Sequence, residues 1–125
     1  MGSGRHIRPR DRWRALLNRN KQILYKLARS SNLWERRIAI IASMQFLKSN
    51  KTVETFRLAK LLLTDKHDLI HKAVGWALRE AGKVAPEELH QFLQKNYGSI
   101  PRTALRYAIE KYSPEVRKRL LAGRF

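Results

Sequence analysis

Cysteine is absent from the 125 residues, so neither a disulfide framework nor a thiolate metal site is possible. No apolar run approaches the roughly 20 residues that span a bilayer, so we expect no membrane partner. The basic start of the chain lacks the apolar core of a secretory signal. We therefore expect a cytoplasmic protein, with a mitochondrial-type presequence over residues 5–19 as the alternative.

Acidic residues are scarce. Ten Asp and Glu stand against 27 Lys and Arg, which gives a formal net charge of +17. Cations placed on phosphates release condensed counterions, so this balance is typical of chains that bind polyanions. The basic residues recur along the chain and do not form one tail, which favours nucleic-acid binding over a merely soluble basic protein.

Glycine and proline are few, 6 and 4 residues, and most of them fall between runs with helical periodicity. No segment alternates at period two, so the sequence predicts an all-α fold in one domain. The predicted helices are 10–19, 21–29, 33–48, 53–64, 67–82, 86–96 and 101–112, followed by a short helix that Ser113 caps and Pro114 begins.

Three similar segments suggest a repeat. Arg37-Ile38-Ala39, Lys72-Ala73-Val74 and Arg102-Thr103-Ala104 occupy corresponding places in alternate helices. Helix pairs at a period of about 30–45 residues are typical of HEAT and armadillo repeats. We therefore predict a right-handed α-solenoid of about three helix pairs over residues 21–125. Residues 1–20 would form a basic arm or a short capping helix, and a three-layer helical bundle is the alternative fold.

Each predicted helix has an apolar stripe that we expect to be buried. The expected core residues are Ile38, Ile40, Ile41 and Ala42; Val53, Phe56, Ala59, Leu62 and Leu63; and Leu69, Ile70, Ala73, Ala77 and Leu78. Gly75 interrupts one stripe at a cost of about 1 kcal/mol relative to Ala. Its presence indicates close approach by another helix or by a ligand.

Basic and aromatic residues share one face of the helix at 67–82. Lys72, Trp76 and Arg79 are spaced i, i+4 and i+7. A Trp flanked by cations can stack on a base or a sugar, although packing in the core is the alternative.

Four arginines extend this basic surface onto neighbouring helices. Arg36 and Arg37 offer planar forks that suit phosphate, or they are solvated, one of them paired with Glu35 or Glu54. Arg102 and Arg106 lie one turn apart, with Tyr107 and Lys111 at their border. With Lys72 the two arginines would form a stripe able to follow a phosphate backbone.

Signals for catalysis are weak. His67 and His71 are spaced i, i+4 around Asp68, but no further ligand completes a metal site, so we expect no metal. The sequence has neither a phosphate-binding glycine loop nor a nucleophile elbow, and we expect no cofactor.

Three segments carry a resemblance to a known family: ILYKLA at 23–28, LWERRIAI at 33–40 and HKAVGWALRE at 71–80. They resemble the C-terminal half of the AlkD-type bacterial DNA alkylation repair glycosylases. The resemblance implies HEAT-like repeats that wrap duplex DNA in a concave basic groove. It also implies excision of cationic N3- or N7-alkylated purines without base flipping, with Arg37 and Trp76 beside the damaged nucleotide.

The family also places a Trp and an Asp on an upstream helix. Here the corresponding stretch is RHIRPRDRWRALLNRN, where Asp11 and Trp13 occur in a different order and spacing. Since a carboxylate would stabilise the developing sugar cation, Asp11 is the catalytic candidate, and we expect full catalysis to be lost.

We therefore predict a protein that binds duplex DNA, mainly through the phosphate backbone, without full glycosylase catalysis. One alternative is an active glycosylase that uses Asp11 or a carboxylate from a second subunit. The other is a scaffold for protein or RNA, with a homodimer formed through an exposed apolar seam.

Overall fold

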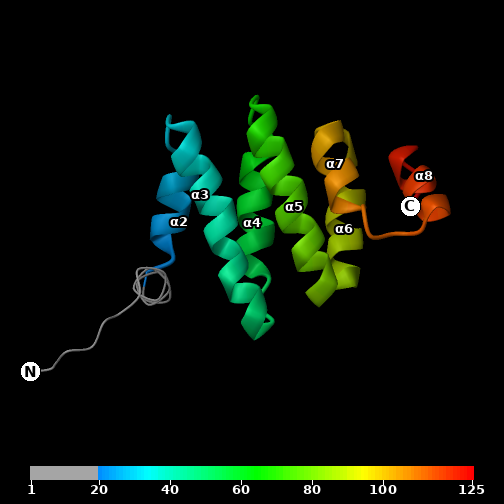
Figure 1. Cartoon of the computed structure of the whole chain (residues 1–125), viewed down its shortest axis with the longest axis horizontal. Helices are drawn as coiled ribbons and strands as arrows, with labels where there is room; N and C mark the ends of the chain where they lie inside the picture. Colours follow the sequence, from blue (N-terminus) through cyan, green and yellow to red (C-terminus); the bar gives the residue numbers. More distant parts are fainter. Residues whose placement is uncertain (1–19) are drawn as a thin grey trace, which may run out of the picture.

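The computed structural model describes residues 20–125 (Figure 1). All regular elements in this range are helices, which confirms the all-α prediction. They are α2 (Gln22–Ala28), α3 (Leu33–Ser43), α4 (Val53–Leu62), α5 (Asp68–Val84), α6 (Pro86–Asn96), α7 (Arg102–Ala108) and α8 (Pro114–Leu121), with short 3-10 helices η1 (Met44–Ser49) and η2 (Tyr97–Ser99). The predictions for Asp11, Trp13 and the N-terminal arm lie outside the described residues. No helix of residues 20–125 is long and apolar enough to cross a membrane.

The helix starts follow the capping signals in the sequence. Asn32 caps α3, where its side-chain oxygen accepts hydrogen bonds from the backbone N–H of Trp34 at 2.8 Å and of Glu35 at 3.3 Å. Ser113 caps α8 in the same way, and Pro86 and Pro114 occupy the first positions of α6 and α8. The starts of these helices were therefore predictable.

Two helices, α3 and α7, end at least four residues earlier than predicted. The segment expected to be one helix to residue 48 is α-helical only to Ser43, and the rest tightens into η1. The Ser43 hydroxyl donates to the Ile40 carbonyl at 2.6 Å, and such local bonds compete with the helical ladder. Asn50 then ends η1 with a left-handed backbone conformation, at φ 59°. Likewise α7 ends at Ala108, although a helix to residue 112 was predicted.

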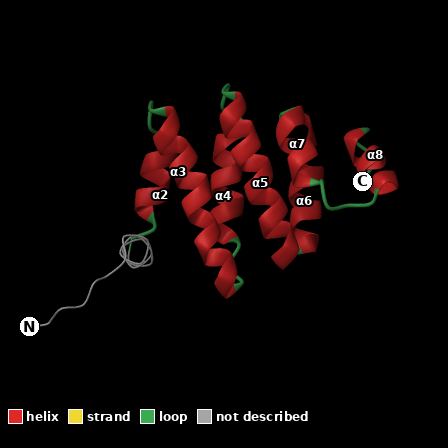
Figure 2. Cartoon of the chain, viewed as in Figure 1, coloured by secondary structure: helices red, strands yellow, loops and turns green. Residues whose placement is uncertain are grey.

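The helices follow one another in pairs along the long axis of the molecule, with α8 at the far end (Figure 1). Short loops join them at the helix ends (Figure 2). The first helices of the pairs, α2, α4 and α6, form one layer. Phe56 packs against Phe92 with ring centroids 5.6 Å apart, and Thr52 donates to Glu88 at 2.8 Å. Each of these contacts between α4 and α6 joins residues 36 apart in the sequence. The second helices form the other layer, where α5 contacts both α3 and α7.

The core lies between these layers and is centred on α5. Ile70, Ala73, Val74, Ala77, Leu78 and Ala81 of α5 are buried, together with Leu24, Ile40, Leu58, Leu93, Leu105 and Ile109 from the surrounding helices. Gly75 lies against α7. The close neighbour that the sequence predicted for Gly75 is therefore a helix of the same chain.

Three residues expected in the core are at the surface. Ile38 is 52% exposed, Val53 53% and Leu69 37%. Ile38 and Ile40 lie about 200° apart on a helix, so only one can face the core, and α3 buries Ala39, Ile40 and Ser43. Val53 and Leu69 lie in the first turns of their helices, where Thr55 and Ile70 take the buried positions.

Candidate nucleic-acid interface

A hollow of about 290 Å³ opens on the layer formed by α3, α5 and α7. Its lining residues are Arg37, Leu69, Lys72, Ala73, Trp76, Arg79 and Tyr107. Four of the predicted site residues, Arg37, Lys72, Trp76 and Arg79, are therefore brought together, three by the periodicity of α5 and one by the contact of α3 with α5. We call this set of lining residues the Trp76 face.

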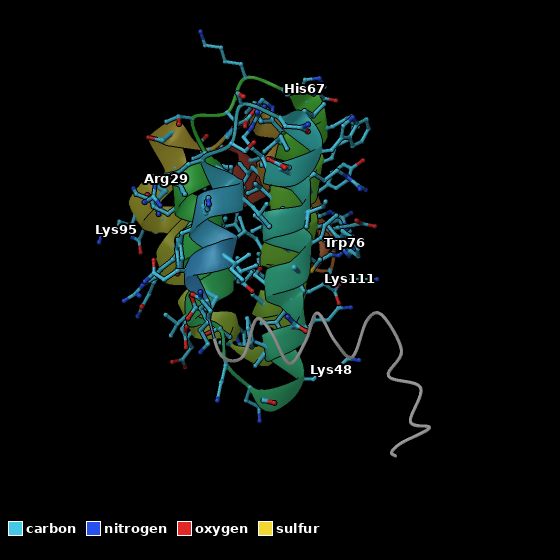
Figure 3. The ribbon with its side chains drawn as sticks, turned by 90° about the vertical axis from the view of Figure 1, so that its left-hand side faces the viewer. Arg29, Lys48, His67, Trp76, Lys95 and Lys111 are labelled. Carbon is cyan, nitrogen blue, oxygen red and sulfur yellow. The ribbon has the colours of Figure 1, made fainter. Side chains whose placement is uncertain are left out.

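Aromatic side chains line the hollow without being buried by the fold. Trp76 and Tyr107 are each 37% exposed, beside Leu69 and Ala73. Figure 3 shows Trp76 and Lys111 on the same side of the molecule, opposite Arg29 and Lys95. Trp76 is thus a half-exposed surface residue and not part of the central core, which leaves part of its ring open to a ligand.

The cations of the Trp76 face differ in how they are held. Lys72 forms an exposed ion pair with Asp68 at 3.4 Å. Arg79 is bound more firmly, because it pairs with both Glu80 and Glu110. Within residues 20–125, the Arg37 side chain makes no hydrogen bond or ion pair, so its donors face no internal competitor.

Carboxylates stand at the edge of this face, and none of the described residues that line the hollow is acidic. Burial alone would raise the pKa of Glu80, but the hydrogen bonds and charges of Lys83 and Arg79 outweigh it and lower that pKa. Glu80 is therefore ionised and engaged with its own cations. The hollow is lined by aromatic and cationic side chains, a combination that suits a sugar-phosphate chain.

Arg36 lies elsewhere and has internal partners. Its Nε donates to Asp65 at 2.6 Å, and its Nη1 donates to the Ser30 carbonyl at 3.1 Å. Through these two bonds Arg36, which lies on α3, connects the loop before α3 to the loop after α4. Neither Glu35 nor Glu54 is its partner. Burial would raise the pKa of Asp65, but Arg36, the His67 backbone N–H and the charge of His71 together lower it.

Arg102 and Arg106 do not line the hollow. Arg102 Nη1 donates to the Leu121 carbonyl at 2.8 Å and to the Tyr97 hydroxyl at 3.3 Å, so it connects the start of α7 to α8. Arg106 is exposed on α7, one turn further along. Tyr107, which the sequence placed only at the border of the basic stripe, lines the hollow instead, because the next turn of α7 faces α5 at Gly75.

The histidine pair has local structural roles. His67 caps α5 by accepting from the Leu69 backbone N–H at 3.3 Å, and His71 Nε2 lies 2.5 Å from the Asp65 carbonyl oxygen. In the part of the chain that the structure describes, no group of three or more His, Cys, Asp or Glu side chains could hold a metal ion.

Comparison with known proteins completes the description of the site. Searches of curated proteins and of solved structures find no match to this chain. The model of one protein family, described as DNA alkylation repair enzyme, matches residues 9–112, which include every residue of the Trp76 face. The chain belongs to the DNA alkylation repair enzyme family.

Proposed function

We propose that this protein binds duplex DNA through the Trp76 face, chiefly by contacts to the phosphate backbone. The observation that carries the proposal is the hollow itself, where Arg37, Lys72 and Arg79 surround two half-exposed aromatic rings. Arg37 would take a phosphate in a bidentate hydrogen bond, and Lys72 would exchange its exposed partner Asp68 for a second phosphate. Trp76 and Tyr107 would lie against a sugar or base.

The proposed scaffold is a HEAT-like, right-handed α-solenoid of three helix pairs. The paired order of the helices supports it, as do the two contacts that join residues 36 apart on α4 and α6. In such a scaffold α3, α5 and α7 would form the concave inner layer, and Arg106 would extend the basic surface along it. Binding of this kind is tolerant of sequence and weakens steeply with salt. We propose that it takes place in the cytoplasm.

A second candidate function is excision of cationic alkylpurines, which membership of the repair family favours. The described lining of the hollow supplies no carboxylate to stabilise the sugar cation. Catalysis would therefore need Asp11, which lies outside the described residues, or a second subunit. For this reason DNA binding without full glycosylase activity is our first proposal.

One experiment separates these functions. Release of the alkylated base is measured from a duplex that contains 7-methylguanine, while binding of the same duplex is followed at two salt concentrations. We expect salt-sensitive binding with no release above the spontaneous rate. Release that is lost in Asp11→Asn would establish the glycosylase instead. Absence of both binding and release would contradict both functions and favour a scaffold, for which the exposed Trp34 and Ile38 offer a seam for a homodimer.

A further inference from the structure

A second group of cations lies on the other layer of helices. Figure 3 shows Arg29 and Lys95 on the side of the molecule opposite Trp76 and Lys111. We call this group the outer ridge; it consists of Lys26, Arg29, Arg57, Lys60 and Lys95, all of them exposed. None of these residues lines the hollow of the Trp76 face.

Contacts within and between the outer helices link several members of this group. Arg29 Nη1 donates to the Tyr25 carbonyl at 3.5 Å, and Arg57 lies beside the Tyr25 hydroxyl, where it opposes the rise in the pKa of Tyr25 that burial and Glu54 cause. On α4, the Lys60 ammonium group donates to the side chain of Asn96, the neighbour of Lys95. The ridge therefore crosses α2, α4 and α6. Because neighbouring helices pack 8–10 Å apart, the length of the ridge across three helices is about 20 Å.

Charges of opposite sign are separated along these helices. Glu54, Glu87 and Glu88 lie in the first turns of α4 and α6, and α2 contains no acid. Asp65, in the loop after α4, is already paired with Arg36. Apart from Glu54, which shares the Tyr25 hydroxyl with Arg57, no carboxylate of α2, α4 or α6 lies in the same helix half as a ridge residue.

Helix stability explains only part of this arrangement. Lys26, Lys60 and Lys95 occupy the last turns of their helices, where a cation complements the helix dipole. Arg57 lies in the middle of α4, away from the helix end. Arg29 follows the end of α2, where Lys26 already places a positive charge beside the negative end of the helix dipole. The ridge therefore has more positive charge than its helix ends require.

The ridge carries no large hydrophobic side chain that is exposed, although the partly buried Ile23 and Tyr25 line a hollow with Lys26 and Arg29. The large hydrophobic residues that are exposed in residues 20–125 are Trp34, Ile38, Val53, Leu69, Trp76 and Tyr107, and none lies on α2, on α6 or in the second half of α4. Protein interfaces and membrane-surface helices generally bury apolar or aromatic side chains. A surface with cations and no such anchor suits a polyanion with regularly spaced charge, held by phosphate contacts.

We propose that the outer ridge binds the phosphate backbone of a second DNA duplex, so that one protein molecule bridges two duplexes. The inference rests on the proposed DNA binding by the Trp76 face. The two surfaces are on opposite layers, each about 10 Å thick, so one straight duplex cannot contact both. Bridging then needs no second protein molecule.

The test uses the full chain with two duplexes of 30 base pairs that contain no alkylated base. One duplex is fixed to beads, and the other carries a fluorescent label in solution. Capture of the fluorescent duplex on the beads is measured together with the Kd for a single duplex. The ridge variant is K26Q/R57Q/K95Q, with one substitution on each outer helix. Its matched control is K118Q/R119Q/R124Q, which removes the same three charges from exposed positions on or just after α8.

We expect the ridge variant to lower capture about tenfold or more while its Kd for one duplex stays within roughly threefold, and the control to capture as the unaltered chain does. Equal loss in both variants would overturn the inference, because total charge would then be the cause. Unaltered protein that binds one duplex but captures no second would overturn it and leave the proposed function intact. A ridge variant that still captures DNA but no longer sediments with anionic phospholipid vesicles would overturn it in favour of a membrane surface.

Discussion

Gly75 of α5 lies directly against Ala104 of α7. A Cβ atom placed on residue 75 would lie 2.6 Å from the Ala104 carbonyl oxygen and 2.5 Å from the Cβ of Tyr107. The Ala104 carbonyl belongs to the backbone, and the Cβ of Tyr107 is fixed to it, so neither atom can move without a shift of α7. The contact sets the distance between the two helices that carry Trp76 and Tyr107, and it thereby sets the width of the hollow.

We therefore expect Gly75→Ala to destabilise the protein. The substitution favours the helix by about 1 kcal/mol, but overpacking a tight contact costs typically about 1–3 kcal/mol. The net loss should appear as a lower midpoint in urea unfolding. Gly98→Ala is the matched control, because no atom lies within 4 Å of a Cβ built there. A Gly75→Ala protein as stable as the unaltered chain would show that α7 moves freely against α5.

Neighbouring arginines on α3 should separate stability from binding. Arg37→Ala removes a cation with no described partner and should weaken DNA binding by about 1 kcal/mol, roughly fivefold in Kd, with the salt slope reduced by about one. Its unfolding midpoint should stay unchanged. Arg36→Ala removes the Asp65 pair and should lower stability while leaving the Kd of the folded protein nearly unchanged. The opposite pattern would contradict the proposed site.

The Arg36–Asp65 pair also predicts a pH dependence. The folded state lowers the pKa of Asp65, so the contribution of the pair is complete above the unfolded value of about 4 and is lost as pH falls through the folded value. Asp65→Asn should therefore cost about 1–3 kcal/mol near pH 7, and the difference from the unaltered chain should shrink below about pH 4. Urea unfolding at several pH values measures this difference. A constant difference across that range would mean that the carboxylate charge contributes nothing.

Local signals made most of the fold predictable, because capping residues and helical periodicity act over a few positions. Pro86 begins α6, and Ser113 and Pro114 begin α8, as the sequence assigned them. For α3 the sequence offered Ser31 or Asn32 as the cap, and Asn32 is the one that is used. The rotation of α3 was not predictable in the same way. Its sequence offers apolar residues on several sides, and packing against α2 and α5 decides that Ile40 is buried and Ile38 exposed.

The candidate site shows the same division. The positions of Lys72, Trp76 and Arg79 on one face follow from helix geometry alone. The absence of Arg102 from the hollow does not, because its partner Leu121 comes from a helix that packs on α7 through tertiary contacts. Tyr107 was named only as a border residue because the register of α7 against Gly75 is likewise a tertiary property.

Trp76 and Trp34 offer a comparison of two exposed tryptophans. Trp34 is 58% exposed on α3 and lies outside the hollow, whereas Trp76 lines it. If a sugar or base packs on Trp76, Trp76→Ala should weaken binding by about 1–3 kcal/mol, with a smaller effect from Trp34→Ala. Fluorescence anisotropy with a labelled duplex measures both. Equal effects would place the duplex across α3 and not over the hollow.

Glu110 provides a prediction in the opposite direction. It pairs with Arg79 from the edge of the Trp76 face, and its own side chain is 56% exposed. A phosphate that approaches Arg79 must displace this carboxylate and is repelled by its charge. Glu110→Gln should therefore tighten DNA binding by up to about 1 kcal/mol, most visibly at low salt.

Glu87→Gln, on the first turn of α6 in the opposite layer, removes the same charge and is the control for the general rise in positive charge. A larger gain for Glu110→Gln than for Glu87→Gln would mean that Arg79 takes part in binding. Equal gains would mean that only net charge matters, and Arg79 would then be a structural partner of Glu80 and Glu110, leaving Arg37 and Lys72 to hold the phosphates.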